Sequence, residues 1–364
     1  MKKIAIKQRF YPNAQQTELL ANTFGCARFV YNAILRWRTD AYYKDGESIS
    51  YNKASAKLTE LKKEFDWLKE VSSVPLQQAL RHQQSAFKNF WDKRAKYPQF
   101  KKKHAKQSIT LANSAFRYKD GQLFIAKSKQ SLNIRWSREL PSEPSTITIS
   151  KDKAGRYFVS MLCEFESKPK PMPVTAKTVG IDLGLNSLFI TDNGEKVDNP
   201  RHTKRYANKL AYLQRKLAKK QKGSKNRDKA RQKVARLHAK IADCRLDNLH
   251  KLSRKLINEN QVVCVESLAV KNMIRNPKLS KSIADASWGE FVRQLKYKAE
   301  WAGRTIAEVD QWFPSSKRCS CCGFVNESMP LNIRDWTCPE CKTHHDRDVN
   351  AAINIKTVGL AELA

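Results

Sequence analysis

Four cysteines in the last fifth of the 364-residue sequence have the spacing of a metal site: Cys319, Cys322, Cys338 and Cys341. They form two C-x-x-C pairs separated by 15 residues, and each pair can place two thiolates on one tetrahedral ion. The spacing predicts one structural Zn²⁺ ion held by these four side chains. Cys321, His344 and His345 are alternative ligands, but only the four cysteines give both pairs the same spacing.

Three carboxylates have the placement of a second, catalytic kind of metal site. Asp182 and Glu266 each end a short apolar run, and Asp348 opens a helical pattern beyond the last cysteine. Carboxylate oxygens are hard ligands that suit Mg²⁺ or Mn²⁺ better than zinc. Together, three such acids can hold two ions that activate a water and stabilise the leaving 3′ oxygen of a phosphodiester. The pattern therefore predicts metal-dependent phosphodiester hydrolysis.

Each acid also has an ordinary interpretation. Asp182 is suited to a turn before Gly184, and Asp348 is suited to a helix N-cap. Glu266 can pair with a lysine of the basic segment that precedes it. The joint pattern favours the metal site, because three such acids in a chain of formal charge +34 are poorly explained as solvated surface.

The charge itself restricts the class of protein. Lysine and arginine number 69 against 35 aspartates and glutamates, so the chain needs a polyanionic partner, and nucleic acid is the first candidate. A membrane surface is the alternative, but no apolar run approaches the roughly 20 residues of a spanning helix. Residues 1–10 have no apolar stretch of signal-peptide length. We therefore expect a protein without a membrane partner that is cytoplasmic, or nuclear if the host has a nucleus.

The first half of the chain predicts a helical region inserted in a small β domain. Residues 3–9 have the pattern of a strand, and apolar residues then recur at helical spacing. From Ser108 the pattern alternates, with turns at Asp120-Gly121 and Ala154-Gly155, which indicates about five strands. We expect a small, wedge-like β-barrel, completed by the first strand, from residues 1–10 and 107–168, with a helical recognition domain between, at residues 11–106.

The second half predicts an α/β domain. A proline-rich linker at residues 169–176 precedes it, and strands then alternate with helices, which is typical of an α/β core. A basic helical hairpin at residues 201–257 carries 20 lysines and arginines against three aspartates between positions 201 and 255. The three acids have the positions expected in an RNase H-like core of residues 177–312 and 344–364, and the cysteines form a zinc finger inserted at residues 313–343. The predicted fold class is thus multidomain α+β.

These motifs resemble the TnpB (OrfB) family of transposon-encoded, RNA-guided DNA nucleases, which is related to type V CRISPR effectors. The resemblance covers nearly the whole chain, and its specific segments are Arg9–Asn13, Val74–Leu80, Tyr97–Lys103, Gly180–Gly184, Val265-Glu266, Pro314–Cys341 and His345–Ala352. It implies a RuvC-like nuclease in which Asp182, Glu266 and Asp348 are the catalytic, magnesium-binding acids. In the family pattern the catalytic acid precedes Asn350 by two residues, which favours Asp348 over Asp346.

The resemblance also implies the partners. The helical region and the β domain would hold a guide RNA derived from the transposon end and read a short motif beside the double-stranded DNA target. Base pairing would select the sequence, and protein contacts would go mostly to the nucleic-acid backbone. We expect one protein chain per guide RNA.

Five further residues are candidates for nucleic-acid contact. Tyr51, Gln77, Gln78 and Thr110 have basic neighbours, and glutamine can read adenine edges while aromatic rings stack on bases. The two glutamines are equally compatible with a plain helix surface. Arg347 can contact the scissile phosphate or brace the acids.

The leading hypothesis is an RNA-guided, Mg²⁺-dependent DNA endonuclease of a transposable element. The alternatives are a guide-binding regulator that does not cut, a DNA-strand-transferring transposase, and a zinc-ribbon RNA-binding protein. The regulator would lack one of the acids, and the zinc-ribbon protein leaves the three-acid pattern unexplained.

Overall fold

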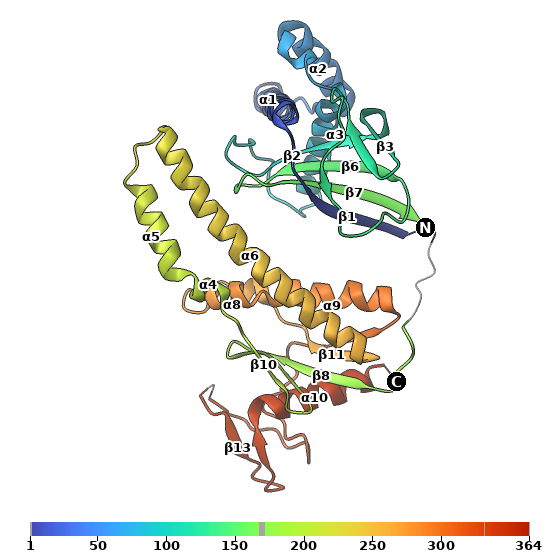
Figure 1. Ribbon diagram of the computed structural model, residues 1–364. Helices are drawn as coiled ribbons and strands as arrows, with labels where there is room; N and C mark the ends of the chain where they lie inside the picture. Colours follow the sequence, from blue (N-terminus) through green and yellow to red (C-terminus); the bar gives the residue numbers. More distant parts are fainter. Residues whose placement is uncertain (1, 167–171, 331, 364) are drawn as a thin grey trace. The chain divides into compact units, whose positions relative to one another are not determined.

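The computed structural model describes residues 2–166, 172–330 and 332–363 (Figure 1). The chain divides into two compact units, Met1–Ser167 and Lys168–Ala364, and each combines helices with strands, so the predicted mixed α/β multidomain fold is confirmed. Residues 169–171 of the predicted linker lie outside the described residues, and residues 172–176 form no helix or strand. No described helix has both the length and the apolar character needed to cross a membrane.

The helices of the first unit form where the apolar spacing predicted them. They are α1 (Ala14–Asp45), α2 (Tyr51–Glu64), the short 3₁₀ helix η1 (Asp66–Lys69) and α3 (Ser73–Trp91). Asn13 caps α1, because its side chain accepts a hydrogen bond from the Gln16 backbone while the Gln16 side chain accepts one from the Asn13 backbone. The helix ends at Gly46, whose φ of 65° suits glycine. α1 therefore runs well beyond the apolar residues that predicted it.

An antiparallel sheet completes the first unit, with strand order β2-β6-β7-β1-β5. The first strand pairs with β7 and β5, so the prediction that it joins the later strands is confirmed. A separate hairpin, β3–β4, turns at Asp120 and Gly121, which both have positive φ, as this dipeptide predicts. The elements are β1 (Lys2–Phe10), β2 (Gln107–Ala112), η2 (Asn113–Ala115), β3 (Phe116–Lys119), β4 (Gln122–Ile125), β5 (Ile134–Arg135), β6 (Pro144–Lys151) and β7 (Tyr157–Phe165).

The second unit contains the predicted RNase H-like core, a mixed sheet of order β10-β9-β8-β11-β12. β8 to β10 are antiparallel, whereas β11 is parallel to both β8 and β12. The strands are β8 (Thr178–Leu183), β9 (Ser187–Thr191), β10 (Lys196–Asp198), β11 (Val262–Glu266) and β12 (Thr305–Val309).

Helices cover both faces of this sheet. Val263 and Val265 of β11 share a core with α6 and α9, whereas Cys264 between them packs with Ile355 of α10. Because side chains alternate along a strand, α10 lies on the face opposite α6 and α9, as Figure 1 shows. The helices are α4 (His202–Arg205), α5 (Ala207–Ala218), α6 (Lys225–Glu259), α7 (Val270–Met273), α8 (Ser280–Ala286), α9 (Trp288–Ala302) and α10 (Arg347–Ala361).

Two glycines allow α10 to lie directly on the sheet. A Cβ atom at Gly180 of β8 would be 2.2 Å from the backbone oxygen of Ala352, and one at Gly359 would be 2.8 Å from Cys264 Sγ. Only a residue without a side chain fits at either contact. The glycines thus set the distance between α10 and the strands that carry the first two acids.

Candidate functional site

The core brings the three predicted acids together. Asp182 lies near the end of β8 and Glu266 ends β11, and these neighbouring strands are parallel, with Ile181 opposite Val265. Asp348 lies in the first turn of α10. Burial, and then the negative charges of Asp348 and Glu266, raise the pKa of Asp182 to about 7, although Arg347 and Arg334 oppose this shift. The charges of Asp348 and Glu266 thus act on Asp182, so the three predicted acids, from two strands and one helix, lie near one another.

The donor set fits Mg²⁺. All three carboxyl groups are partly buried, and burial also raises the pKa of Glu266. The negative charges of Asp348 and Glu266 act unfavourably on an ionised Asp182, and a divalent cation would relieve that repulsion.

Asp346 and Asp348 have different surroundings. Asp346 caps α10 by accepting hydrogen bonds from the backbone nitrogens of Asp348 (3.0 Å) and Val349 (3.1 Å). It also accepts one from Lys196 Nζ at 2.5 Å. Burial would raise the pKa of Asp346, but these hydrogen bonds hold it below its usual value. Asp346 therefore caps the helix, while the Asp348 charge acts on Asp182.

Arg334 also lies at the acidic site, although the sequence pattern did not predict a role for it there. Its Nη1 atom lies 3.2 Å and 3.4 Å from the two carboxylate oxygens of Asp348. Arg334 immediately precedes β13 (Asp335–Thr337), and β13 pairs with β14 (His344–Asp346) to form the hairpin that leads into α10. The spacing of the cysteines brings this arginine back to the acids, so the zinc finger contributes a cation to the site.

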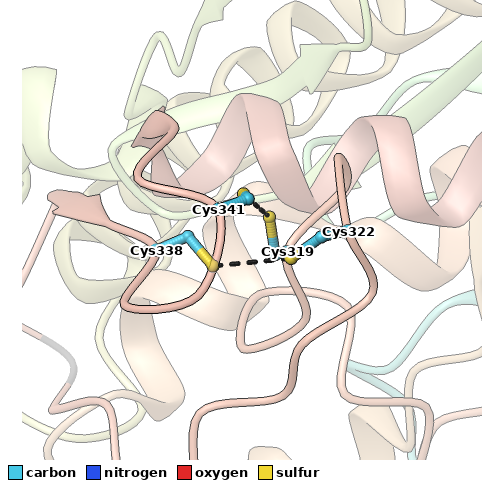
Figure 2. Close-up of side chains that lie close together, drawn as sticks. All are labelled: Cys319, Cys322, Cys338 and Cys341. Atoms are coloured by element: carbon cyan, nitrogen blue, oxygen red, sulfur yellow. Dashed lines mark hydrogen bonds between the residues drawn. The ribbon is translucent and has the colours of Figure 1, made fainter.

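The four predicted cysteines form one cluster, shown in Figure 2. All four sulfur atoms lie within 4.8 Å of one another, as a single tetrahedral Zn²⁺ ion requires. His345 Nε2 lies 3.1 Å from Cys319 Sγ, and its ring packs against Trp336. Cys321 is exposed and lies outside the cluster.

Two asparagines of α10 bind the first cysteine loop to the nuclease core. Asn350 Nδ2 donates to the Arg318 backbone oxygen at 2.7 Å, and the Ser320 backbone nitrogen donates to Asn350 Oδ1 at 2.9 Å. Asn354 Nδ2 donates to the backbone oxygen of Ser315 at 2.8 Å. Both side chains are buried. The helix that carries Asp348 therefore also positions the zinc finger.

Arg347, predicted to contact the scissile phosphate or to brace the acids, forms its hydrogen bonds with the loop between the cysteine pairs. Its side chain is buried, and Nη1 donates to the backbone oxygens of Pro330 (2.8 Å) and Ile333 (3.3 Å). Nη2 lies 3.4 Å from Ser316 Oγ. These contacts hold the loop between the cysteine pairs and leave the guanidinium turned away from solvent.

The other candidate contact residues have different environments. Gln77 is exposed on α3, and Gln78 is half-buried beside it. Tyr51 packs against the core of the first unit, with the Arg81 guanidinium 5.7 Å from its ring centre. Thr110 is buried in β2, with its hydroxyl 3.3 Å from that of Thr148. Of the four, Thr110 is the least accessible, although Ile109 and Leu111 on either side of it are the β2 residues that belong to the core and Thr110 lies on the other face of the strand.

An RNase H-like core with an acidic site and an inserted four-cysteine finger defines the class of this protein. Residues 160–277 match the family OrfB_IS605, described as "Probable transposase", and residues 288–355 match "Cas12f1-like, TNB domain". Residues 1–47 match an OrfB-associated "Helix-turn-helix domain". In this structure that segment is β1 followed by one continuous helix, α1.

Relatives match over almost the full chain. A Streptomyces pristinaespiralis protein named "Putative RNA-guided DNA endonuclease" is 52% identical, over 100% of this chain and 90% of the relative. The Escherichia coli K12 protein named "Putative RNA-guided DNA endonuclease InsQ" is 32% identical, over 99% of this chain and 93% of the relative. The chain belongs to the OrfB (TnpB) family.

Solved structures share the fold. A Cas12f1–sgRNA–target DNA complex contains a chain that matches with a TM-score of 0.59 and 16% identity, over 94% of this chain and 83% of that one. The mini-RNA-guided endonuclease CRISPR-Cas_phi3 matches with a TM-score of 0.55 and 10% identity, over 99% and 92% respectively. At these identities the likeness concerns the fold.

Proposed function

We propose that this protein is an RNA-guided, Mg²⁺-dependent (or Mn²⁺-dependent) DNA endonuclease of a transposable element. It cleaves target DNA beside a short flanking motif by two-metal phosphodiester hydrolysis. The observation that carries the proposal is the convergence of Asp182, Glu266 and Asp348, whose mutual repulsion contributes to the raised pKa of Asp182. The names of the two full-length relatives support the same activity.

The chain's own residues would perform the positioning. Asp182 and Glu266 are fixed by paired strands, and Asp348 by a helix packed on the same sheet. Bound magnesium would supply an activated water and charge neutralisation at the leaving 3′ oxygen. Arg334 would orient the Asp348 carboxylate, because its guanidinium contacts both oxygens.

The partners follow from the charge. A guide RNA from the transposon end and the DNA paired to it present many phosphates, and the hairpin of α5 and α6 has a large excess of lysine and arginine for binding them. Base pairing with the guide would select the target, with one chain per guide RNA. We place this activity in the cytoplasm of a bacterial host.

The first prediction concerns the acids. Asp182→Asn, Glu266→Gln and Asp348→Asn should each lower cleavage at least a hundredfold while guide-RNA binding stays unchanged, because each removes a metal-binding charge. The protein is purified with its co-expressed RNA, and Mg²⁺-dependent cutting is measured on plasmids that carry the matching target beside randomised flanks. Asp346→Asn is the matched control, since asparagine also caps helices.

Three outcomes would contradict this proposal. Retained cutting by any triad variant would remove that acid from the mechanism. Target binding without cutting by the unmodified protein would favour the regulator. Rejoined transposon ends produced by the protein alone would favour the transposase that the family description names.

The second prediction concerns zinc. Cys338→Ser should reduce bound zinc from one ion per chain to a small fraction, and DNA cleavage should fall with it, because the finger positions Arg334 beside Asp348. Cys321→Ser is the control and should retain both zinc and activity, since Cys321 lies outside the cluster. Elemental analysis and the plasmid assay measure the two effects. A zinc-free variant with full activity would make the metal dispensable.

A further inference from the structure

A basic segment of the first unit is fastened along α1 at three points. We call residues 97–107 the strap. The hydroxyl groups of Tyr97 and Thr39 lie 2.8 Å apart. The Asn32 side chain bonds both the backbone nitrogen (2.8 Å) and the backbone oxygen (3.0 Å) of Lys101. Arg28 Nη1 donates to Gln107 Oε1 at 2.9 Å. The strap therefore runs antiparallel to α1.

The fastening holds the backbone of the strap against α1 and leaves Lys102, Lys103 and Lys106 facing solvent, whereas the Lys101 ammonium lies over the Tyr31 ring, 4.2 Å from its centre. The Gln107 side-chain amide donates to the backbone oxygens of Lys102, Lys103 and Ala105, at 3.1, 3.2 and 2.8 Å. The strap contains four lysines and no acidic residue, and all four lysines are exposed. A structured backbone with outward-facing lysines suits the phosphates of a nucleic acid.

A groove lies between the strap and α1. Its volume is about 410 Å³, within the range of small-ligand sites. Arg28 and Arg36 line it from the helix, together with the ring of Phe29, and Phe100 lines it from the strap. Phe100 is 55% exposed. Among the described residues, Arg36 forms one ion pair, with Asp40. Arg36 Nε lies 3.7 Å from Asp40 Oδ2, and both side chains are exposed. The groove thus combines an accessible aromatic ring with two guanidinium groups.

Gly25 keeps one side of this groove open. Glycine is the least favourable residue for a helix interior apart from proline, so its presence within α1 calls for a reason. A Cβ atom at Gly25 would meet, among the described atoms within 4 Å, only Arg28 Nη2 at 3.9 Å. Packing within the unit therefore does not require the glycine, whereas a ligand that enters the groove would benefit from the space.

We propose that this groove binds an unpaired nucleotide of the guide RNA, with its base against Phe100 and its phosphates at Arg28 and Arg36. Aromatic rings and arginines are the groups that bind single-stranded nucleotides without a sequence requirement. The inference rests on the proposed function. RNA is favoured because the guide is the nucleic acid that is bound both before and during target recognition.

The test uses the full-length protein purified with its co-expressed RNA. Ultraviolet cross-linking and mass spectrometry of peptides should find a ribonucleotide adduct on Phe100. Gly25→Leu should reduce that adduct at least tenfold, because the added side chain fills the groove. Ala21→Leu places the same side chain at an exposed position of α1 and should leave the adduct unchanged. Circular dichroism and thermal melting verify that both variants fold.

A competition assay gives a second measurement. Phe100→Ala should weaken retention of the guide about five- to tenfold, as expected for the loss of one stacked base. Tyr43→Ala, another exposed aromatic residue of the first unit, should have no such effect. Equal retention by Phe100→Ala and the unmodified protein would overturn the proposal.

The cross-linking result also distinguishes this inference from the proposed function. A complex that cuts its target and cross-links elsewhere, but not at Phe100, would overturn the groove assignment and leave the nuclease intact. A deoxyribonucleotide adduct that forms only after target DNA is added would assign the groove to DNA and overturn the RNA assignment.

Discussion

At the scale of single residues, the contact between Arg334 and Asp348 is the one that most affects the chemistry of the acidic site. Its guanidinium reaches both oxygens of Asp348 from a segment that belongs to the zinc finger. A guanidinium that hydrogen-bonds both oxygens restricts the orientation of the carboxylate. Arg334 is therefore a positioning residue, and it couples the order of the finger to the order of the acids.

We predict that Arg334→Gln lowers cleavage about ten- to a hundredfold, because a charged hydrogen bond to Asp348 is lost. Arg334→Lys should recover part of the activity, since lysine restores the charge without the planar geometry. Guide-RNA binding and zinc content should not change, which separates this effect from misfolding. Lys342→Gln, at an exposed position of the same finger, is the charge-matched control. Unaltered cleavage by Arg334→Gln would show that the ion pair has no role.

Sequence reasoning could find the acids but not the residues that hold them. Asp182 and Glu266 were predictable because they end apolar strands, and Asp348 because it opens a helix. Arg334 approaches Asp348 only after the finger has folded back, and no local pattern records that approach. Arg347 was predicted to contact nucleic acid or to brace the acids, and its burial supports a bracing role in the finger. For Thr110, the alternation of its strand places it on the face opposite the core residues Ile109 and Leu111, and its burial there was not predictable from that pattern.

At the scale of elements, α10 determines whether the active site is assembled. One side of the helix rests on β8 and β11 at the two glycine contacts, and Asn350 and Asn354 hold the finger. Its first turn carries Asp348. A displacement of this single helix would therefore move a catalytic acid and the finger together.

We predict that Gly180→Ala destabilises the protein by about 1–3 kcal/mol and lowers cleavage more than tenfold. The new Cβ atom would overlap the backbone of α10, so the helix and Asp348 must shift away from β8. Gly289→Ala is the matched control, because a Cβ there meets nothing within 4 Å among the described residues, and stability should stay within about 1 kcal/mol. Thermal unfolding and the plasmid assay measure both. Wild-type cleavage by Gly180→Ala would show that the close contact is dispensable.

Helices and strands with strongly periodic apolar residues were predictable from the sequence, whereas short polar strands were not. The alternation of helices and strands that was expected in the second half of the chain is present, for example in α9 and β12. β10 was not predicted, because Lys196–Asp198 is short and polar and becomes a strand only by pairing with β9. The β13–β14 hairpin was not predictable for the same reason, because its strands have three residues each and form only where the finger folds back on itself.

At the scale of the whole molecule, the composition identified the partner, and long-range pairing determined the architecture. The net charge of +34 and the basic hairpin indicate nucleic acid without any knowledge of the fold. The order of strands in the nuclease sheet could not be derived in the same way, because β8 pairs with β11 across the whole basic hairpin. Such contacts depend on the folded chain, and a single sequence carries no direct signal of them.

The late position of α10 has a consequence for protein synthesis. Domains generally fold as units in the order in which the ribosome makes them, so the unit of residues 1–167 can fold while the acidic cluster still lacks Asp348. A nascent chain at that stage lacks one of the three acids that the proposed mechanism requires. The order of residues along the polypeptide thus delays completion of the acidic cluster until both acid-bearing strands and the cysteine finger have been made.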